Sequence, residues 1–400
     1  MSGPQISLLP DGRRLHMNHG PIDLVVEAFG ERAEVEAAYA QAAARFRTIL
    51  TELVAELPDL RRPAEATARA FAGPTARRME SAVTPLAEDF SAPGLAQIGE
   101  DIATPSPTQK VADNATPVAM PNAGDNPAPG IPPRTIRFIT PMAAVAGAVA
   151  DEMLAAMTAG RTLSRAYVND GGDIALYLAP GGSLTLAIAG TGNGFADRIE
   201  IGHADPIRGI ATSGWRGRSF SLGIADAVTV LAPTAAAADA AATIIANAVD
   251  LPAHPAITRA PADTLQPDTD LGKRLITTGV GALTAEDIAL ALAYGAAVAE
   301  DLADRGLIAG AALFLAGEAR VVGNMRQLPM SAQTTSPVCS ANHLAGASHG
   351  SRPSFGPPTP WGRGTALIPD SDNAARRSAA TTSVSSPPFN GGEAASAASR

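Results

Sequence analysis

The sequence has one cysteine, two lysines and few aromatic residues. Cys339 can form no disulfide within the chain, and a single cysteine cannot supply a zinc cluster. Phe, Tyr and Trp make up 4% of the 400 residues, although 46% are hydrophobic. Alanine supplies much of that hydrophobic fraction, which predicts a closely packed core of small side chains. The lone cysteine is typical of a reducing compartment, so we expect a cytoplasmic protein.

Charge and hydropathy argue against two classes of partner. The formal net charge is −9 at pH 7, and the basic residues are scattered rather than gathered into the stripe that nucleic acid requires. The longest nearly uncharged runs, 138–150 and 288–299, fall short of the ~18 to 20 residues that span a bilayer. The first twenty residues contain no apolar signal segment. We therefore expect neither nucleic acid nor a membrane as a partner.

Two long segments lack the apolar periodicity of folded structure. Residues 92–133 are rich in Pro, Ala, Asn, Asp and Thr, and residues 324–400 are dominated by Ser, Pro, Gly, Ala and Thr. Such segments bury too little apolar surface to offset the entropy lost on ordering. We expect a flexible insertion and a disordered tail, which leaves one folded domain made of residues 14–91 and 134–323.

The rest of the sequence has helix and strand patterns in turn. Three- and four-residue spacing or an unbroken Ala-rich composition predicts helices over 32–57 (ended by Pro58), 74–85, 142–157, 233–249 and 285–302. β-branched runs predict strands within 15–29 and over 166–178, 183–189, 207–211, 227–231 and 311–322. Short Gly-rich turns, such as the one at 190–194, are typical of an antiparallel meander. The sequence therefore predicts an α+β fold with a largely antiparallel sheet flanked by helices.

A first candidate site is the segment Asn169-Asp170-Gly171-Gly172-Asp173, which follows a short strand. Paired glycines let a planar ligand or another backbone approach closely, because no side chain stands in the way. The same residues also suit a hairpin turn in which Asn and Asp satisfy local amides. The sequence alone leaves both interpretations open.

A second candidate runs from Thr212 through Ser213 and Gly214 to Arg216 and Arg218. Hydroxyls, free amides and guanidinium groups on a loop are the groups that hold phosphate. An ordinary solvated turn has the same composition, so this alternative also stays open.

A third candidate pairs Asp239 with Thr243 on the helix predicted over 233–249. Residues four apart lie on one face of a helix, so a carboxylate and a hydroxyl can point toward one spot. Mg²⁺ prefers such oxygen ligands, completed by water, carbonyl oxygens and phosphates. A solvated polar stripe on an Ala-rich helix is the alternative.

Taken in order, Asn-x-Gly-Gly-Asp, Thr-Ser-Gly and Asp-x-x-x-Thr resemble the ApbE-like superfamily, whose named activity is FAD:protein FMN transfer. A glycine-bearing helix start that ends in Asp precedes these motifs in that family, and residues 145–151 occupy the same place here. The resemblance spans about residues 140–249 and is that of a divergent, uncharacterised prokaryotic branch. Ala146 stands where the family has Lys, and only Asp226 matches a His and Asp-Pro motif of the family.

The resemblance implies a site for Mg²⁺ and a flavin. Asp239 and Thr243 would bind Mg²⁺ together with the carbonyl oxygen of Val145, and the cation would bridge the pyrophosphate of FAD. The residues implied to bind the flavin are Asn169, Gly171, Gly172, Asp173, Thr212, Ser213, Gly214 and Arg216. No catalytic side chain and no oligomeric state are assigned.

Three functions are consistent with these patterns. The first is an ApbE-like, Mg²⁺-dependent FAD:protein FMN transferase or FAD hydrolase, whose partners would be FAD or FMN and, for transfer, an acceptor protein. The second is a non-catalytic flavin- or nucleotide-binding module. The third is a structural homologue without activity. Gly-x-Ser-x-Gly, His-Glu-x-x-His and phosphate-loop motifs do not occur, so serine hydrolases, zinc peptidases and NTPases have no support.

Overall fold

A computed structural model of the protein describes residues 3–87, 138–187 and 198–323. The insertion predicted at 92–133, the glycine-rich turn at 190–194 and the tail predicted from 324 onward lie outside these residues. The described residues contain a mixed α+β structure built on one large sheet. This confirms the fold class that the sequence predicts.

The sheet has nine strands, and every neighbouring pair in it is antiparallel. In spatial order the strands are β1 (Gln5–Leu8), β2 (Leu15–His19), β3 (Ile22–Gly30), β4 (Leu163–Asp170), β5 (Asp173–Leu178), β8 (Gly209–Ser213), β9 (Ala227–Ala232), β12 (Gly310–Leu315) and β13 (Glu318–Gly323). Residues 22–30 thus pair directly with residues 163–170, which joins the N-terminal segment to the rest of the chain.

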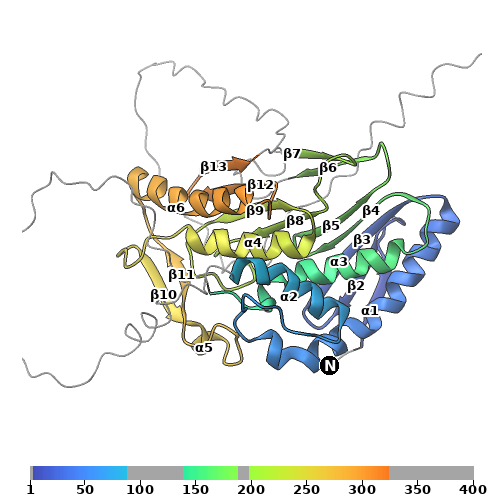
Figure 1. The fold of residues 1–400 in the computed structure, drawn as a ribbon, viewed down its shortest axis with the longest axis horizontal. Coiled ribbons are helices and arrows are strands. Elements are labelled where there is room, and N and C mark those ends of the chain that lie inside the picture. Colours follow the sequence, from blue (N-terminus) through green and yellow to red (C-terminus); the bar gives the residue numbers. More distant parts are fainter. Residues whose placement is uncertain (1–2, 88–137, 188–197, 324–400) are drawn as a thin grey trace, which may run out of the picture. The chain divides into compact units, whose positions relative to one another are not determined.

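Helices cover one face of this sheet, and the main core lies between them and the strands (Figure 1). They are α1 (Arg32–Leu60), α2 (Pro74–Ala87), the short 3-10 helix η2 (Pro141–Ala144), α3 (Val145–Thr158), α4 (Ala235–Ala248) and α6 (Ala285–Asp304). The core between them is Ala-rich, with larger side chains such as Phe46, Ile49, Met79 and Met153 between small ones. None of the helices in the described ranges has the length and apolar character needed to cross a bilayer.

The opposite face of the sheet carries a second, smaller core. The hairpin of β6 (Ser183–Ala187) and β7 (Arg198–Gly202) contributes leucines and isoleucines to it, and Leu176 and Phe314 come from the large sheet. A separate hairpin of β10 (Ile257–Pro261) and β11 (Leu275–Val280) is followed by α6, and the short helix α5 (Ala262–Leu265) connects its strands.

Several boundaries differ from the sequence prediction. The first helix continues through Pro58 to Leu60, because a proline in the last turn removes only one intrahelical hydrogen bond. The runs 166–178 and 311–322 are each two strands joined by a tight turn. The sequence gives no signal for β1, β7, β10 or β11, which are strands of only four to six residues.

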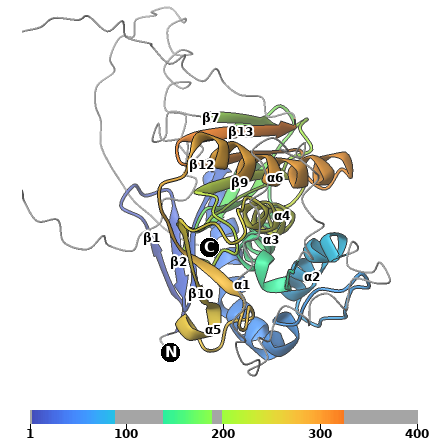
Figure 2. The same ribbon diagram turned by 90° about the vertical axis from the view of Figure 1, so that its left-hand side faces the viewer.

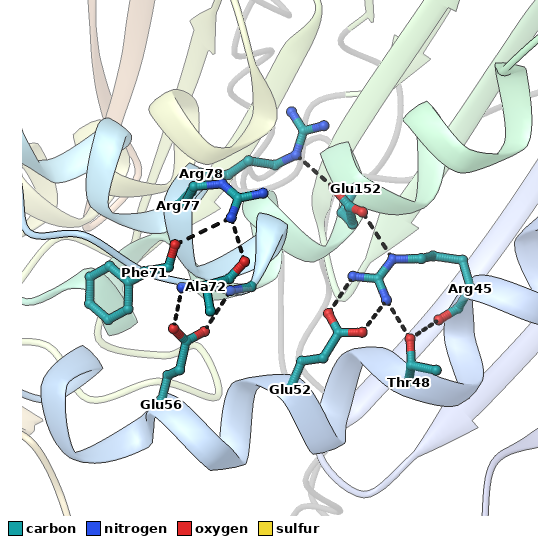
Figure 3. A network of polar contacts seen from close by, with 10 residues as sticks. Arg45, Thr48, Glu52, Glu56, Phe71, Ala72, Arg77, Arg78 and Glu152 are labelled. Carbon is teal, nitrogen blue, oxygen red and sulfur yellow. Dashed lines mark hydrogen bonds and ion pairs between the residues drawn. The ribbon is translucent and has the colours of Figure 1, made fainter.

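A network of ion pairs fastens α3 to α1 and α2 (Figure 3). Glu152 of α3 accepts hydrogen bonds from Arg45 of α1 at 2.9 Å and from Arg78 of α2 at 3.0 Å. Arg45 also binds both carboxylate oxygens of Glu52 at 2.7 Å. Glu56 accepts the backbone N–H groups just before α2. The four charged side chains around Arg45 all have partners; they are Glu52, Glu56, Arg78 and Glu152. The depression of about 360 Å³ lined by Arg45, Glu52 and Glu56 is therefore part of a structural contact.

The start of β8 presses against the start of α4, and this contact supplies a test of the fold. A Cβ at Gly209 would lie 2.0 Å from the carbonyl carbon of Thr234, so Gly209→Ala should lower the free energy of unfolding by about 1–3 kcal/mol. Gly279→Ala is the matched control, because a Cβ there would lie 3.6 Å from Thr258, an ordinary contact. Urea denaturation measures both variants. Equal stability of the two would show that β8 and α4 are not packed in this way.

Candidate functional site

The first candidate segment forms a two-residue hairpin turn. Gly171 and Gly172 connect β4 to β5 with φ angles of +65° and +122°, which only glycine adopts readily. Asp170 and Asp173 are the last facing pair before the turn. The side-chain oxygen of Asn169 accepts the N–H of Gly172 at 2.8 Å. The hairpin interpretation is therefore correct, and the turn brings two carboxylates together at one end of the sheet.

The residues of this segment divide between the two faces of the sheet. Side chains alternate along a strand, and Val168 and Ala175 belong to the main core on the helix-covered face. Asp170 and Asp173, each two residues from one of them, share that face. Asn169 points to the opposite face. The structure thus separates the amide of Asn169 from the two carboxylates, which the sequence treats as one group.

The carboxyl groups of Asp170, Asp173 and Asp239 interact electrostatically and form an acidic cluster, in which Asp170 is buried and Asp173 and Asp239 are half-buried. Asp170 is 5% exposed, and burial together with the nearby charge of Asp173 raises its pKa to about 8. Burial also raises the pKa of Asp173, although the hydrogen bond that Asp173 accepts from the N–H of Thr212 at 3.2 Å lowers it. Burial and the charge of Asp173 raise the pKa of Asp239 well above its ordinary value. The guanidinium of Arg218 opposes these shifts at Asp170 and Asp173.

Asp239 and Thr243 lie on the same face of α4, as the sequence predicts. The polar residues of this helix are Asp239, Thr243 and Asn247, spaced four apart and partly exposed on a helix that is otherwise largely buried. Asp239 accepts the N–H of Gly147 at 3.0 Å, and Asn247 accepts the N–H of Leu222 at 2.9 Å. The hydroxyl of Thr243, between them, makes no hydrogen bond to another described residue.

The bond from Gly147 to Asp239 places the carboxyl group of Asp239 at the first turn of α3. Val145 begins α3, two residues before Gly147, and is partly exposed. The carboxylate of Asp239 therefore lies at the first turn of α3, where a helix has backbone N–H groups without intrahelical partners. Within the described ranges, no three His, Cys, Asp or Glu side chains are grouped so that they could hold a metal ion. A cation here would need the hydroxyl, a carbonyl oxygen and oxygens of its own ligand.

The loop after β8 reaches the same end of the sheet, but its two arginines differ. Arg216 donates to Asp226 at 2.6 Å and lies over the ring of Trp215. Arg218 instead extends to the glycine turn, since a Cβ at Gly171 would lie 1.8 Å from its Nη2 atom. Arg216 is thus occupied by a local ion pair, and Arg218 is the guanidinium close to the acidic cluster.

Gly214 and Thr212, which also belong to the second candidate segment, are each held by a contact with a neighbouring segment. A Cβ at Gly214 would lie 2.5 Å from the carbonyl oxygen of Asp226, so glycine is needed for this close approach. The hydroxyls of Thr212 and Thr229 lie 2.9 Å apart. Thr229 belongs to the strand whose neighbours Ala227 and Leu231 line the smaller core, so Thr212 faces that side of the sheet.

The sequence pattern missed three residues of this arrangement. Asp170 lies inside the first motif and Arg218 inside the second, but the resemblance implies a role for neither. Asp151 ends the helix motif, and its carboxylate accepts the N–H groups of Ala235 and Ala236 at 3.0 and 2.9 Å. Burial raises the pKa of Asp151 in spite of these two bonds. Strand alternation could have indicated Asp170, whereas a contact between two helices gives no local sequence signal.

The raised pKa of Asp170 predicts a particular dependence of stability on pH. The unfolded chain releases this proton near pH 4, whereas the folded protein holds it up to about pH 8. The free energy of unfolding should therefore fall as pH rises through that window. Asp170→Asn removes the titration, so the variant should gain stability relative to the parent between pH 4 and pH 8. Denaturation in the presence of a chelator measures the difference.

Asp268→Asn is the control for this experiment. Asp268 is exposed, and its hydrogen bond to Arg61 lowers its pKa, so its replacement should give no gain over the same pH range. Curves for Asp170→Asn that run parallel to the parent would contradict the burial of an ionisable carboxyl at this turn.

Comparison with known proteins places the chain in a family. Residues 6–100 and 107–321 match a family described as AbpE bacteria. A UPF0280 protein of Methanothrix thermoacetophila is 39% identical over 112 residues, which make up 28% of this chain and 46% of that protein. A UPF0280 protein of Methanopyrus kandleri is 39% identical over 110 residues, or 27% of this chain and 43% of that protein. The chain thus spans less than half the length of these relatives. Because the family match covers more than half of the chain, the protein belongs to the AbpE bacteria family.

Proposed function

We propose that this protein is an ApbE-like flavin-binding protein that uses Mg²⁺ to bind FAD and to split it into AMP and FMN. The FMN would be transferred to an acceptor protein or, with water as the acceptor, released. The resemblance of its motifs and the family match support the flavin. The observation that carries the proposal is the placement of Asp239, on the same helix face as Thr243, at the first turn of α3 and within electrostatic reach of Asp170 and Asp173.

The residues of this site fit a hard divalent cation. Three carboxyl groups, one buried and two half-buried, raise one another's pKa values in part, and the guanidinium of Arg218 opposes the shifts of two of them. Buried negative charge of this kind needs either protons or a cation. Asp239, Thr243 and the Val145 carbonyl would supply oxygen ligands, with the remainder from water and the phosphates of FAD, as Mg²⁺ prefers. Bound there, Mg²⁺ would neutralise charge that develops on the pyrophosphate.

The side chains of the protein would mainly bind and orient. The N–H of Gly147 holds one oxygen of Asp239 and so fixes the direction of the carboxylate. The glycine turn, Asp173 and the loop at Ser213 and Gly214 would hold the flavin end. Asn169 and Thr212 point to the opposite face of the sheet and Arg216 pairs with Asp226, so these three have no part in this arrangement. A hydroxyl of the acceptor or a water molecule would attack the phosphorus of the FMN half and give its proton to solvent water. The anhydride bond breaks, and AMP leaves with the bridging oxygen.

A flavin-binding module without catalysis is the second candidate, and one observation favours it. Ala146 stands at the helix start where the related transferases have Lys. Asp226, the residue retained from their second motif, accepts bonds from Trp215, Arg216 and the N–H of Ala316, so it has a structural role here. Under this alternative the protein binds FAD but releases no AMP.

The enzyme proposal predicts the effect of two conservative substitutions. Asp239→Asn removes a ligand charge, and Thr243→Val removes a hydroxyl at nearly constant volume. Loss of a direct ligand should exceed the about 10- to 100-fold effect that is typical of outer-shell partners, so both variants should lose Mg²⁺-dependent FAD turnover. Chromatography of AMP released from FAD measures this. Circular dichroism should show a folded protein in both cases.

Thr158→Val is the matched control, since the Thr158 hydroxyl bonds only within α3, to the carbonyl of Leu154 at 2.9 Å. This variant should split FAD at the parental rate. AMP release that continues undiminished in chelator would refute the metal assignment. Flavin binding by the parent with no AMP release would establish the non-catalytic alternative instead.

A further inference from the structure

Asp151 joins α3 to the beginning of α4. Its two carboxylate oxygens accept the backbone N–H groups of Ala235 and Ala236, the first two residues of α4. The third N–H of that helix, from Ala237, is bound by the side chain of Thr234 at 3.1 Å. Asp151 and Thr234 therefore share the first turn of α4, one from a neighbouring helix and one from the same chain segment.

The same arrangement exists in the opposite direction. Asp239 of α4 accepts the N–H of Gly147 in the first turn of α3. The two helices touch at Gly147 of α3 and Ala235 of α4. On each helix a carboxyl group follows this contact by four residues, which is about one turn: Asp151 on α3 and Asp239 on α4. A Cβ at Gly147 would lie 2.2 Å from the carbonyl oxygen of Ala235, so the backbones are in direct contact. Both figures show α3 and α4 side by side (Figure 1 and Figure 2).

This reciprocity couples the two carboxylates. The N-terminus of a helix carries a partial positive charge, so two such ends in contact repel each other unless anions lie between them. Asp151 and Asp239 supply one carboxyl group to each end, and each accepts N–H groups of the other helix. If Asp151 is lost, the first turn of α4 loses two hydrogen bonds and its distance from α3 is no longer fixed. The direction of Asp239, which the N–H of Gly147 sets, then changes with it.

We propose that Asp151 is a positioning residue for the Mg²⁺ ligand Asp239, acting through the first turns of α3 and α4. This inference rests on the proposed function for the identity of the cation, but the coupling between the two helix ends is a property of the metal-free protein. Substitution of Asp151 should thus disturb the bond between Gly147 and Asp239, and weaken binding of a divalent cation, without removing any ligand.

The experiment compares Asp151→Asn and Asp151→Ala with Thr234→Ala. Thr234→Ala removes a cap from the same helix end and should cost about 1 kcal/mol of stability, but it leaves the contact with Asp239 intact. Amide hydrogen exchange at Gly147 in the metal-free protein reports the coupling. Titration of the same proteins with Mn²⁺ in the presence of FAD, followed by electron paramagnetic resonance, reports cation affinity. Asp239→Asn serves as the reference for loss of a ligand.

We expect both Asp151 variants to lose exchange protection at Gly147 and to bind Mn²⁺ about 10- to 100-fold more weakly, the range found for outer-shell residues. Asp151→Asn keeps the volume and one acceptor oxygen, so it remains informative if Asp151→Ala fails to fold. Thr234→Ala should lose stability with Gly147 protection and Mn²⁺ affinity unchanged.

The possible failures are distinguishable. Unchanged Gly147 protection and Mn²⁺ affinity in Asp151→Asn, with a parent that binds Mn²⁺, would overturn the positioning role alone. Equal losses of Mn²⁺ affinity in Asp151→Asn and Thr234→Ala would do the same, since any weakening of α4 would then suffice. A parent that binds no Mn²⁺ with FAD present would overturn the proposed function, and with it the role of Asp151 toward a cation.

Discussion

The contact between the first turns of α3 and α4 is the constraint on which the site depends. Gly147 allows the two backbones to touch, and this brings two partially positive helix ends together. Asp151 and Asp239 accept the free N–H groups of these ends, each on the other helix. Glu152, the next residue after Asp151, anchors α3 to α1 and α2 through Arg45 and Arg78. Helix α3 is therefore held on both sides, and the position of Asp239 follows from it.

The same contact explains why the site is acidic and buried at once. Asp239 approaches the end of β4 and β5, where the glycine turn places Asp170 and Asp173 side by side on the helix-covered face. Burial raises the pKa values of all three, which means that the ionised cluster lacks enough compensating charge. A structural core gains nothing from such a cluster, whereas a site that receives a cation and a pyrophosphate does. This is the physical ground for the proposed function.

Much of the fold could be predicted from the sequence, and the failures have physical causes. Apolar spacing is strong over α1, and composition is distinctive over α3, α4 and α6, so the sequence predicts these helices. Short strands such as β1 and β10 have too few residues for a pattern to stand out. Pro58 predicts a helix end at Leu57, although a proline in the last turn disturbs the helix little.

The candidate site was predictable in its parts but not in its assembly. The spacing of Asp239 and Thr243 placed them on one helix face, as observed. Asn169 and Asp170 are adjacent in sequence yet face opposite sides of the sheet, because a shift of one residue in a strand reverses the side. Asp151 could not be recognised as a cap, since its partners come from a helix 84 residues later in the chain.

Asp239 and Thr243 are proposed to bind a divalent cation at the junction of α3 and α4. A crystal structure of the protein with Mn²⁺ and FAD, using the anomalous signal of the metal, tests it most directly. We expect an anomalous peak within coordination distance of oxygens of Asp239 and Thr243 and next to the pyrophosphate. A flavin bound with no peak there, or a peak at a different place in the protein, would contradict it.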